Sequence, residues 1–230
     1  MSHRAHFDSF AKNYDEALSK GLSITGEGPA FYAEQRVIVT KLLIKPKKIA
    51  TATILDFGCG IGTSIPFLAE AFSPTEIVGV DVSGEILAEA RARIKLTHVR
   101  LEFVERTPRD GEMDLVYCNG VFHHIKPEQR AEAFQRIFDS LRSAGYFALW
   151  ENNPLNPGTR LIMAKCPFDR DAMPIVPSQA TKMLIAAGFR IETVVSRFFF
   201  PRPLAFLRPL ETCLSPSLLG GQYLVLARKL

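Results

Sequence analysis

The 230-residue sequence lacks the features that mark disulfide-stapled, zinc-binding and membrane-spanning proteins. Its four cysteines are scattered, with no C-x-x-C pair and no histidine at metal-ligand spacing, so no disulfide framework or structural zinc site is predicted. No charge-free apolar run approaches the length of a membrane span, and the first residues lack the apolar core of a secretory signal. We therefore expect a soluble chain in the reducing cytoplasm.

An excess of charge of one sign is also lacking. The chain has 28 Lys and Arg against 24 Asp and Glu, a net charge of +4, and no basic block, which argues against a nucleic-acid partner. Apolar residues make up 47% and charged residues 23%, as is ordinary for a globular protein. The length fits one domain over residues 1–230.

What the sequence does contain is an alternation of strand-like apolar runs and helical patterns. Strands are predicted at 52–58, 76–82, 99–105, 113–119, 146–152, 189–199 and 222–230, and helices at 61–72, 84–94, 128–141 and 178–187. This order predicts an α/β fold with a doubly wound, mostly parallel sheet. Residues 7–44 are predicted to form a helical cap, and the Pro- and Asn-rich stretch 153–177 a long insertion and candidate substrate lid.

The stretch LDFGCGIGTS, residues 55–64, joins the first predicted strand to the helix that follows. Glycines at 58, 60 and 62 allow unusual dihedral angles and let a ligand approach the backbone. The spacing G-x-G-x-G differs from the dinucleotide pattern G-x-G-x-x-G, and the loop has no P-loop lysine. The loop therefore predicts a nucleoside site without phosphates, with a tight strand–helix turn that binds nothing as the alternative.

Asp81 ends the second predicted strand, beside the glycine loop. A carboxylate there can accept hydrogen bonds from the two hydroxyls of a ribose. The other interpretation is an acidic residue favoured by the positive end of the next helix. Because Asp81 is paired with the loop, we favour the ribose role.

These motifs resemble those of the class I S-adenosylmethionine-dependent methyltransferases. LDFGCGIGTS resembles their first motif, VGVDVS the acidic segment after it, and MDLVYCNGVFHHI the region of their fourth strand. The resemblance covers residues 7–150, and beyond them only the general order of helices and strands fits. It implies a seven-stranded Rossmann-like sheet with an antiparallel last strand. It also implies S-adenosylmethionine as cofactor, S-adenosylhomocysteine as product, and no metal.

The resemblance also assigns site residues. Those implied to hold the methionine and ribose parts of the cofactor are Asp56, Gly58, Cys59, Gly60, Gly62, Asp81, Val82 and Asn119, with Tyr14 and Arg36 as candidates for its carboxylate. One departure concerns the adenine, where such proteins usually have an acid and this chain has ERTP, residues 105–108. Thr107, backbone amides and Glu105 stay open as adenine contacts.

The candidate catalytic residues follow the fourth and fifth strands. Methyl transfer from a sulfonium needs alignment of the reactants, and a hydroxyl acceptor also needs a group that takes its proton. His124 is placed for this role, and Glu151 is the carboxylate alternative. For His124 a structural role is the competing interpretation, and for His123 the structural role is favoured.

The predicted function is therefore methyl transfer to a small-molecule acceptor, with O-methylation favoured and N- or C-methylation open. The acceptor can be sugar- or lipid-linked, and monomer and homodimer both stay open. In residues 197–210, core packing or a protein interface is favoured over membrane contact. The alternative functions are a non-catalytic, cofactor-binding partner protein, and binding of another nucleoside or of NAD.

Overall fold

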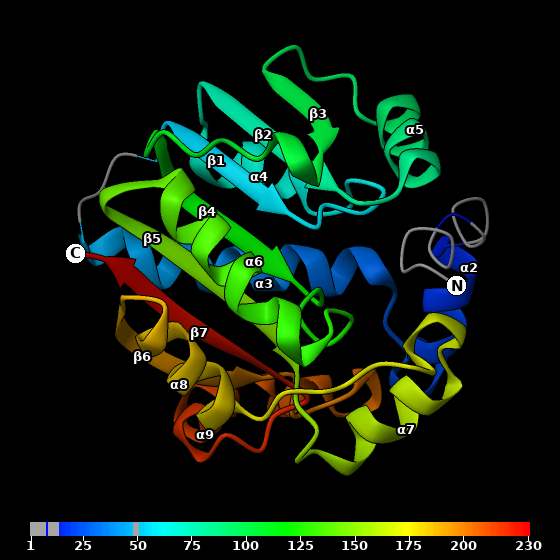
Figure 1. Ribbon diagram of the computed structural model, residues 1–230. Coiled ribbons are helices and arrows are strands. Elements are labelled where there is room, and N and C mark those ends of the chain that lie inside the picture. Colours follow the sequence, from blue (N-terminus) through cyan, green and yellow to red (C-terminus); the bar gives the residue numbers. More distant parts are fainter. Residues whose placement is uncertain (1–7, 9–13, 48–50) are drawn as a thin grey trace.

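The computed structural model describes residues 8, 14–47 and 51–230, and seven strands form one sheet within them. The order across the sheet is β3-β2-β1-β4-β5-β7-β6. The strands are β1 Thr53–Phe57, β2 Glu76–Asp81, β3 Val99–Phe103, β4 Met113–Asn119, β5 Leu141–Asn152, β6 Phe189–Arg197 and β7 Gln222–Lys229. Only β7 runs antiparallel to its neighbours β5 and β6, so both the doubly wound sheet and its antiparallel last strand are confirmed (Figure 1).

Helices cover both faces of the sheet (Figure 1). On one face lie α3 Pro29–Ile44, α4 Ile65–Phe72 and α5 Gly84–Arg93, and on the other α6 Pro127–Ser140 and α8 Pro177–Ala186. The Ser83 side chain caps α5 by accepting from the Ile86 amide at 3.2 Å, as the sequence predicts. Helix α2, Tyr14–Leu22, packs against α7, Pro157–Lys165. Of the predicted cap 7–44, residues 7 and 9–13 lie outside the described residues.

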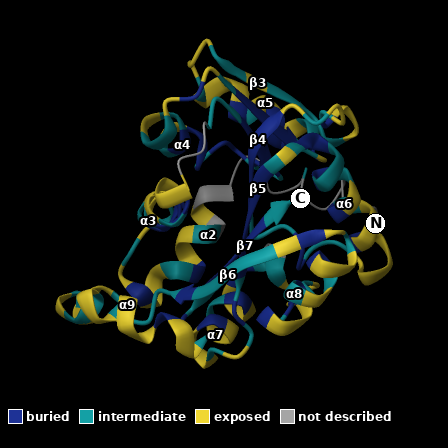
Figure 2. Cartoon of the chain, turned by 90° about the vertical axis from the view of Figure 1, so that its left-hand side faces the viewer, coloured by how far each residue is buried: buried dark blue, intermediate teal, exposed yellow. Residues whose placement is uncertain are grey.

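The core lies along the central strands, where buried residues concentrate (Figure 2). Strands β1 and β4 are buried on both faces because their apolar runs meet helices on either side. The one tryptophan, Trp150 on β5, is buried and donates its Nε1–H to the Thr40 hydroxyl at 3.0 Å. This bond ties α3 to the middle of the sheet.

Three predicted boundaries are wrong. Helix α4 begins at Ile65 rather than 61, because the glycines before it adopt positive φ and form a loop. Strand β5 begins at Leu141 rather than at residue 146. The pairing of β4 with β5 shifts in register near the start of β5, where Ala144 has a φ of +64°. The segment 153–177 contains α7 and a short 3-10 helix, η5 Pro167–Asp169, and is thus more ordered than the loop expected.

Residues 197–210 leave β6 and continue into a kinked 3-10 helix, η6 Arg202–Leu210, followed by α9 Glu211–Leu214. The Glu211 carboxylate accepts hydrogen bonds from the amides of residues 198, 199 and 200. The Glu211 side chain therefore stabilises the bend after β6. In the helix that follows, Phe206 is 75% exposed. Among the described residues, the helices are all too short or too polar to cross a bilayer.

Candidate functional site

The glycine loop after β1 has the geometry that its sequence predicts. Gly58, Gly60 and Gly62 have φ values of +74°, +55° and +81°, a region that other residues rarely adopt. The amides of Gly58 and Cys59 both donate to the Val80 carbonyl, at 2.8 and 2.9 Å. The loop is thereby fixed against the end of β2, where Asp81 lies.

Asp81 joins the loop to the next helix. One carboxylate oxygen accepts from the Gly60 amide and the other from the Ser83 amide, each at 3.0 Å. Burial raises the pKa of this carboxyl, and the amides of Ser83, Gly60 and Val82 oppose the rise. Since each carboxylate oxygen has a second lone-pair site, Asp81 can still accept hydrogen bonds from a ligand diol.

A cavity of about 320 Å³ opens at this edge of the sheet. It brings together five of the predicted cofactor residues and one predicted catalytic residue: Gly58, Gly60, Asp81, Val82, Asn119 and His124. The volume is within the range of small-molecule sites. Because its walls come from β1, β2 and β4, the cavity lies at the carboxyl ends of parallel strands, where α/β proteins bind ligands.

Other predicted residues are buried beside the cavity rather than lining it. Cys59 packs next to Gly79, and Gly62 lines a separate hollow together with Ile94. The hydroxyl of Thr107 donates to the Val104 carbonyl at 2.6 Å, so its proton is unavailable to an adenine. Tyr14 begins α2, but its side chain lies outside the described part of the chain.

Several residues that line the cavity were not predicted from the sequence. Ile86 on α5, Val104 after β3, and Gln129, Glu132 and Arg136 on α6 line the cavity. No motif marks these residues. Ile86 and Val104 give the cavity an apolar surface, which suits the face of a purine ring. Thr107 and Glu105, two of the adenine contacts that the sequence leaves open, do not line this cavity.

The buried groups behind the loop fit the amino-acid end of the implied cofactor. Asp56 Oδ2 and Arg36 Nε are buried, and neither has a hydrogen-bond partner among the described residues. An acceptor and a donor of this kind match the ammonium and carboxylate of a methionine. Burial and the charge of Asp81 raise the pKa of Asp56 to about 7, which Arg36 partly opposes. The residues present therefore fit S-adenosylmethionine.

Two histidines, His123 and His124, follow β4, and of these two only His124 lines the cavity. His123 is buried and its Nδ1 lies 2.5 Å from Glu151 Oε2, while Glu151 Oε1 accepts from the Phe122 amide at 2.7 Å. Both oxygens of Glu151 are thus engaged away from the cavity. The structure contradicts Glu151 as a base facing an acceptor and gives it the role of orienting His123.

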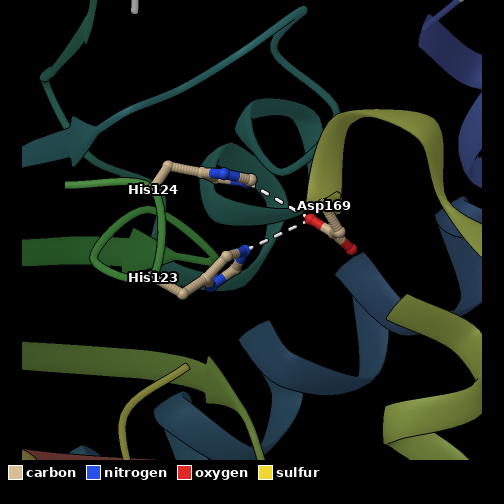
Figure 3. A group of neighbouring side chains, drawn as sticks. All are labelled: His123, His124 and Asp169. Carbon is tan, nitrogen blue, oxygen red and sulfur yellow. Dashed lines mark ion pairs between the residues drawn. The ribbon is translucent and has the colours of Figure 1, made fainter. Parts of the chain in front are cut away.

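Asp169 of η5 completes this group, and no motif in the sequence marks it. Its Oδ1 lies 3.5 Å from His123 Nε2 and 3.4 Å from His124 Nε2, and both rings point toward it (Figure 3). The only available signal was a carboxylate in a segment that leaves the carboxyl end of β5. The insertion therefore reaches back to the catalytic end of the sheet.

The charges in the group follow from these contacts. Burial disfavours the His123 imidazolium, but the carboxylates of Glu151 and Asp169 outweigh burial and raise its pKa to about 10. Burial and the neighbouring charge of His123 lower the pKa of His124. Burial acts to raise the pKa of Asp169, and contact with the two imidazoles reverses this and lowers it below its usual range.

Comparison with known sequences finds similarity to methyltransferases. A methyltransferase-domain family matches residues 54–145. A trans-aconitate 2-methyltransferase of Variovorax paradoxus is 30% identical over 126 residues, which are 54% of this chain and 48% of the relative. A malonyl-[acyl-carrier protein] O-methyltransferase of Coxiella burnetii is 26% identical over 188 residues, 77% and 72% of the two chains. The chain thus spans about half the length of the trans-aconitate relatives it matches, 42% to 58%.

Comparison of structures gives the same fold. Phosphoethanolamine N-methyltransferase 2 of Haemonchus contortus, solved with S-adenosylmethionine, superimposes with a TM-score of 0.69. At 19% identity the match covers all of this chain and 60% of the other. The chain therefore shares the overall fold of that protein.

Proposed function

We propose that this chain, which belongs by fold and by the sequence of residues 54–145 to the class I S-adenosylmethionine-dependent methyltransferases, methylates an oxygen atom of a small molecule. The observation that carries the proposal is that one cavity is lined both by Gly58, Gly60 and Asp81 and by His124. A nucleoside site and a group able to promote loss of a proton are thereby in one space.

The chain's own residues bind and orient the reactants. The bare backbone at Gly58 and Gly60 lets the ribose approach, and Asp81 accepts from its hydroxyls. Asp56 and Arg36 take the amino-acid end. When bound, the cofactor supplies an electrophilic methyl group on a positively charged sulfur. Positioning supplies most of the rate gain in such a displacement, because acceptor, methyl carbon and sulfur must lie in line.

His124 is the residue that we place against the acceptor oxygen, where it promotes loss of a hydroxyl proton. Support comes from its place in the cavity wall and from its contact with Asp169, which orients the ring. The names of the two sequence relatives, which refer to trans-aconitate and to malonyl O-methylation, support a small oxygen acceptor. The acid or alcohol itself is to be found by screening metabolites for formation of S-adenosylhomocysteine.

Replacing Asp81 with alanine is expected to weaken binding of S-adenosylhomocysteine by roughly 1.5–3 kcal/mol, the usual loss for hydrogen bonds to a charged group. Calorimetric titration measures it. The matched control is Asp110→Asn, an exposed acid outside the cavity wall, which should bind as the wild type does. Equal affinity of the Asp81→Ala variant would remove the ribose assignment.

Replacing His124 with alanine is expected to lower turnover of a hydroxyl acceptor by about 10²–10⁴-fold, the usual contribution of a group that assists proton transfer. Affinity for S-adenosylhomocysteine should change less than threefold, because this proposal assigns the ring to the acceptor and not to the cofactor. Turnover and affinity are measured on the same preparation. Unchanged turnover would show that His124 serves only to support the loop.

A further inference from the structure

We propose that His123 Nε2, His124 Nε2 and Asp169 Oδ1 together bind one divalent first-row transition-metal ion, with Zn²⁺ as the representative, and that the ion holds the acceptor oxygen beside the methyl donor. The inference deepens the proposed function and rests on it. It changes how His124 acts, since the ring then contributes as a ligand rather than as the proton acceptor.

The spacing of the three atoms is the first argument. All three lie within 4.8 Å of one another, and Asp169 Oδ1 lies 3.5 and 3.4 Å from the two nitrogens (Figure 3). These two distances are longer than the usual 2.7–3.2 Å of an N–H···O hydrogen bond. They match the separation of about 3.4 Å that bonds of about 2.1 Å impose on neighbouring ligands of a tetrahedral ion.

The second argument is that Asp169 points an unsatisfied oxygen into this group. Its side chain is 7% exposed, and Oδ1 has no hydrogen-bond partner among the described residues. A buried carboxylate oxygen normally has a partner, since an unpaired one is costly. A cation bound equally to both imidazoles and to Oδ1 satisfies it.

The third argument is that a carboxylate orients His123 in the way that carboxylates orient metal-binding histidines. Glu151 accepts from the His123 Nδ1 side at 2.5 Å, which turns Nε2 toward Asp169. Carboxylates that orient a ligating histidine in this way are typical of metal sites. The sequence could not show this arrangement, because its ligands lie on segments more than 40 residues apart.

Backbone contacts hold the insertion in place over the histidines. The Met173 amide donates to the His123 carbonyl at 2.7 Å, and the Arg130 guanidinium donates to the Met173 carbonyl at 2.7 Å. The Tyr223 hydroxyl donates to the Ile175 carbonyl at 2.8 Å. Asp169 is therefore positioned by the fold and not by a free loop, as a preformed ligand set requires.

Two imidazoles and one carboxylate suit Zn²⁺ and its neighbours rather than Mg²⁺ or Ca²⁺, which prefer oxygen. Three protein ligands leave a coordination position for a hydroxyl, and His124 lies in the cavity wall. The acceptor hydroxyl would replace a hydroxide at that position, giving its proton to the hydroxide, which leaves as water. The resulting oxygen forms the bond to the methyl carbon as the carbon–sulfur bond breaks, and the electron pair stays on sulfur.

The test is metal binding by the full chain, stripped with a chelator and titrated with ZnCl₂, then with CoCl₂ monitored by visible absorption. We expect one ion per chain and the intense visible bands of four-coordinate Co²⁺. Asp169→Asn and His124→Gln should each weaken Zn²⁺ binding at least 100-fold, and Glu151→Gln about 10–100-fold. Asp171→Asn, an exposed acid on the same segment, is the matched control and should bind as the wild type does.

Wild-type protein that binds neither ion below about 0.1 mM, or an Asp169→Asn variant that binds Zn²⁺ as tightly as the wild type, would overturn the metal site. The Co²⁺ spectrum needs no variant, so a folding defect in a variant leaves the test intact. Titration with S-adenosylhomocysteine of the same stripped protein separates the two proposals. Cofactor binding without metal binding rejects only the metal site, whereas absence of cofactor binding rejects the proposed function.

Discussion

Replacing Gly58 with alanine is expected to destabilise the protein by roughly 2–5 kcal/mol and to weaken binding of S-adenosylhomocysteine more than tenfold. Two costs add up. A Cβ at this φ of +74° costs an alanine about 1–2 kcal/mol. The same Cβ would lie 2.3 Å from Val121 Cγ2, so the cavity wall must shift, and overpacking of this kind costs about 1–3 kcal/mol.

Gly28→Ala is the matched control. Gly28 has a φ of −93°, and a Cβ built there meets no atom within 4 Å. Its substitution should change the free energy of unfolding by less than about 1 kcal/mol. Denaturant unfolding of both variants and calorimetry with S-adenosylhomocysteine measure the two effects.

A second variant separates the two costs of Gly58→Ala. Adding Val121→Ala removes the methyl groups that the new Cβ would meet, so the double variant should recover the packing part and keep the dihedral part. The coupling between the two substitutions is then expected to be about 1–3 kcal/mol. Additive effects would mean that the loop relaxes without meeting Val121.

The parts of the fold that could be predicted are those that depend on local pattern. The strands around β1, β2 and β4 are continuous apolar runs, and β4 begins and ends at the predicted residues. Gly58, Gly60 and Asp81 were predictable because a parallel sheet brings the ends of adjacent strands together. Pattern failed at Leu141, where the chain passes from helix directly into strand with no turn signal.

The rest of the site depends on contacts between distant segments. Asp169 meets the histidines only because α7 and η5 fold back over the end of the sheet, held by Arg130 and Tyr223. Glu151 has the position of a base in the sequence, yet its two oxygens are taken by Phe122 and His123. Strand ends thus indicate which residues are near the site, while packing decides which of them face the ligand.

Asp56 gives the remaining prediction, in which stability depends on pH. Burial and the charge of Asp81 raise the pKa of Asp56 to about 7, against 3.8 for an aspartate exposed to water. The folded chain therefore binds a proton that the unfolded chain has lost between these two values. The contribution of Asp56 to the free energy of unfolding is therefore largest below about pH 4 and decreases as the pH rises. It is lost once the pH is well above 7.

Asp56→Asn keeps the shape of the side chain and removes its titration. The free energy of unfolding of the variant, relative to wild type, is expected to rise by roughly 2.5 kcal/mol between pH 5 and pH 8. Urea unfolding at several pH values measures it, and Asp110→Asn, at an exposed position, should show no comparable rise. A flat difference for Asp56→Asn would mean that the neighbouring guanidinium of Arg36 keeps the carboxylate charged throughout. In that case Asp56 on β1 carries a fixed negative charge, and binding of S-adenosylmethionine should not depend on the protonation of this group.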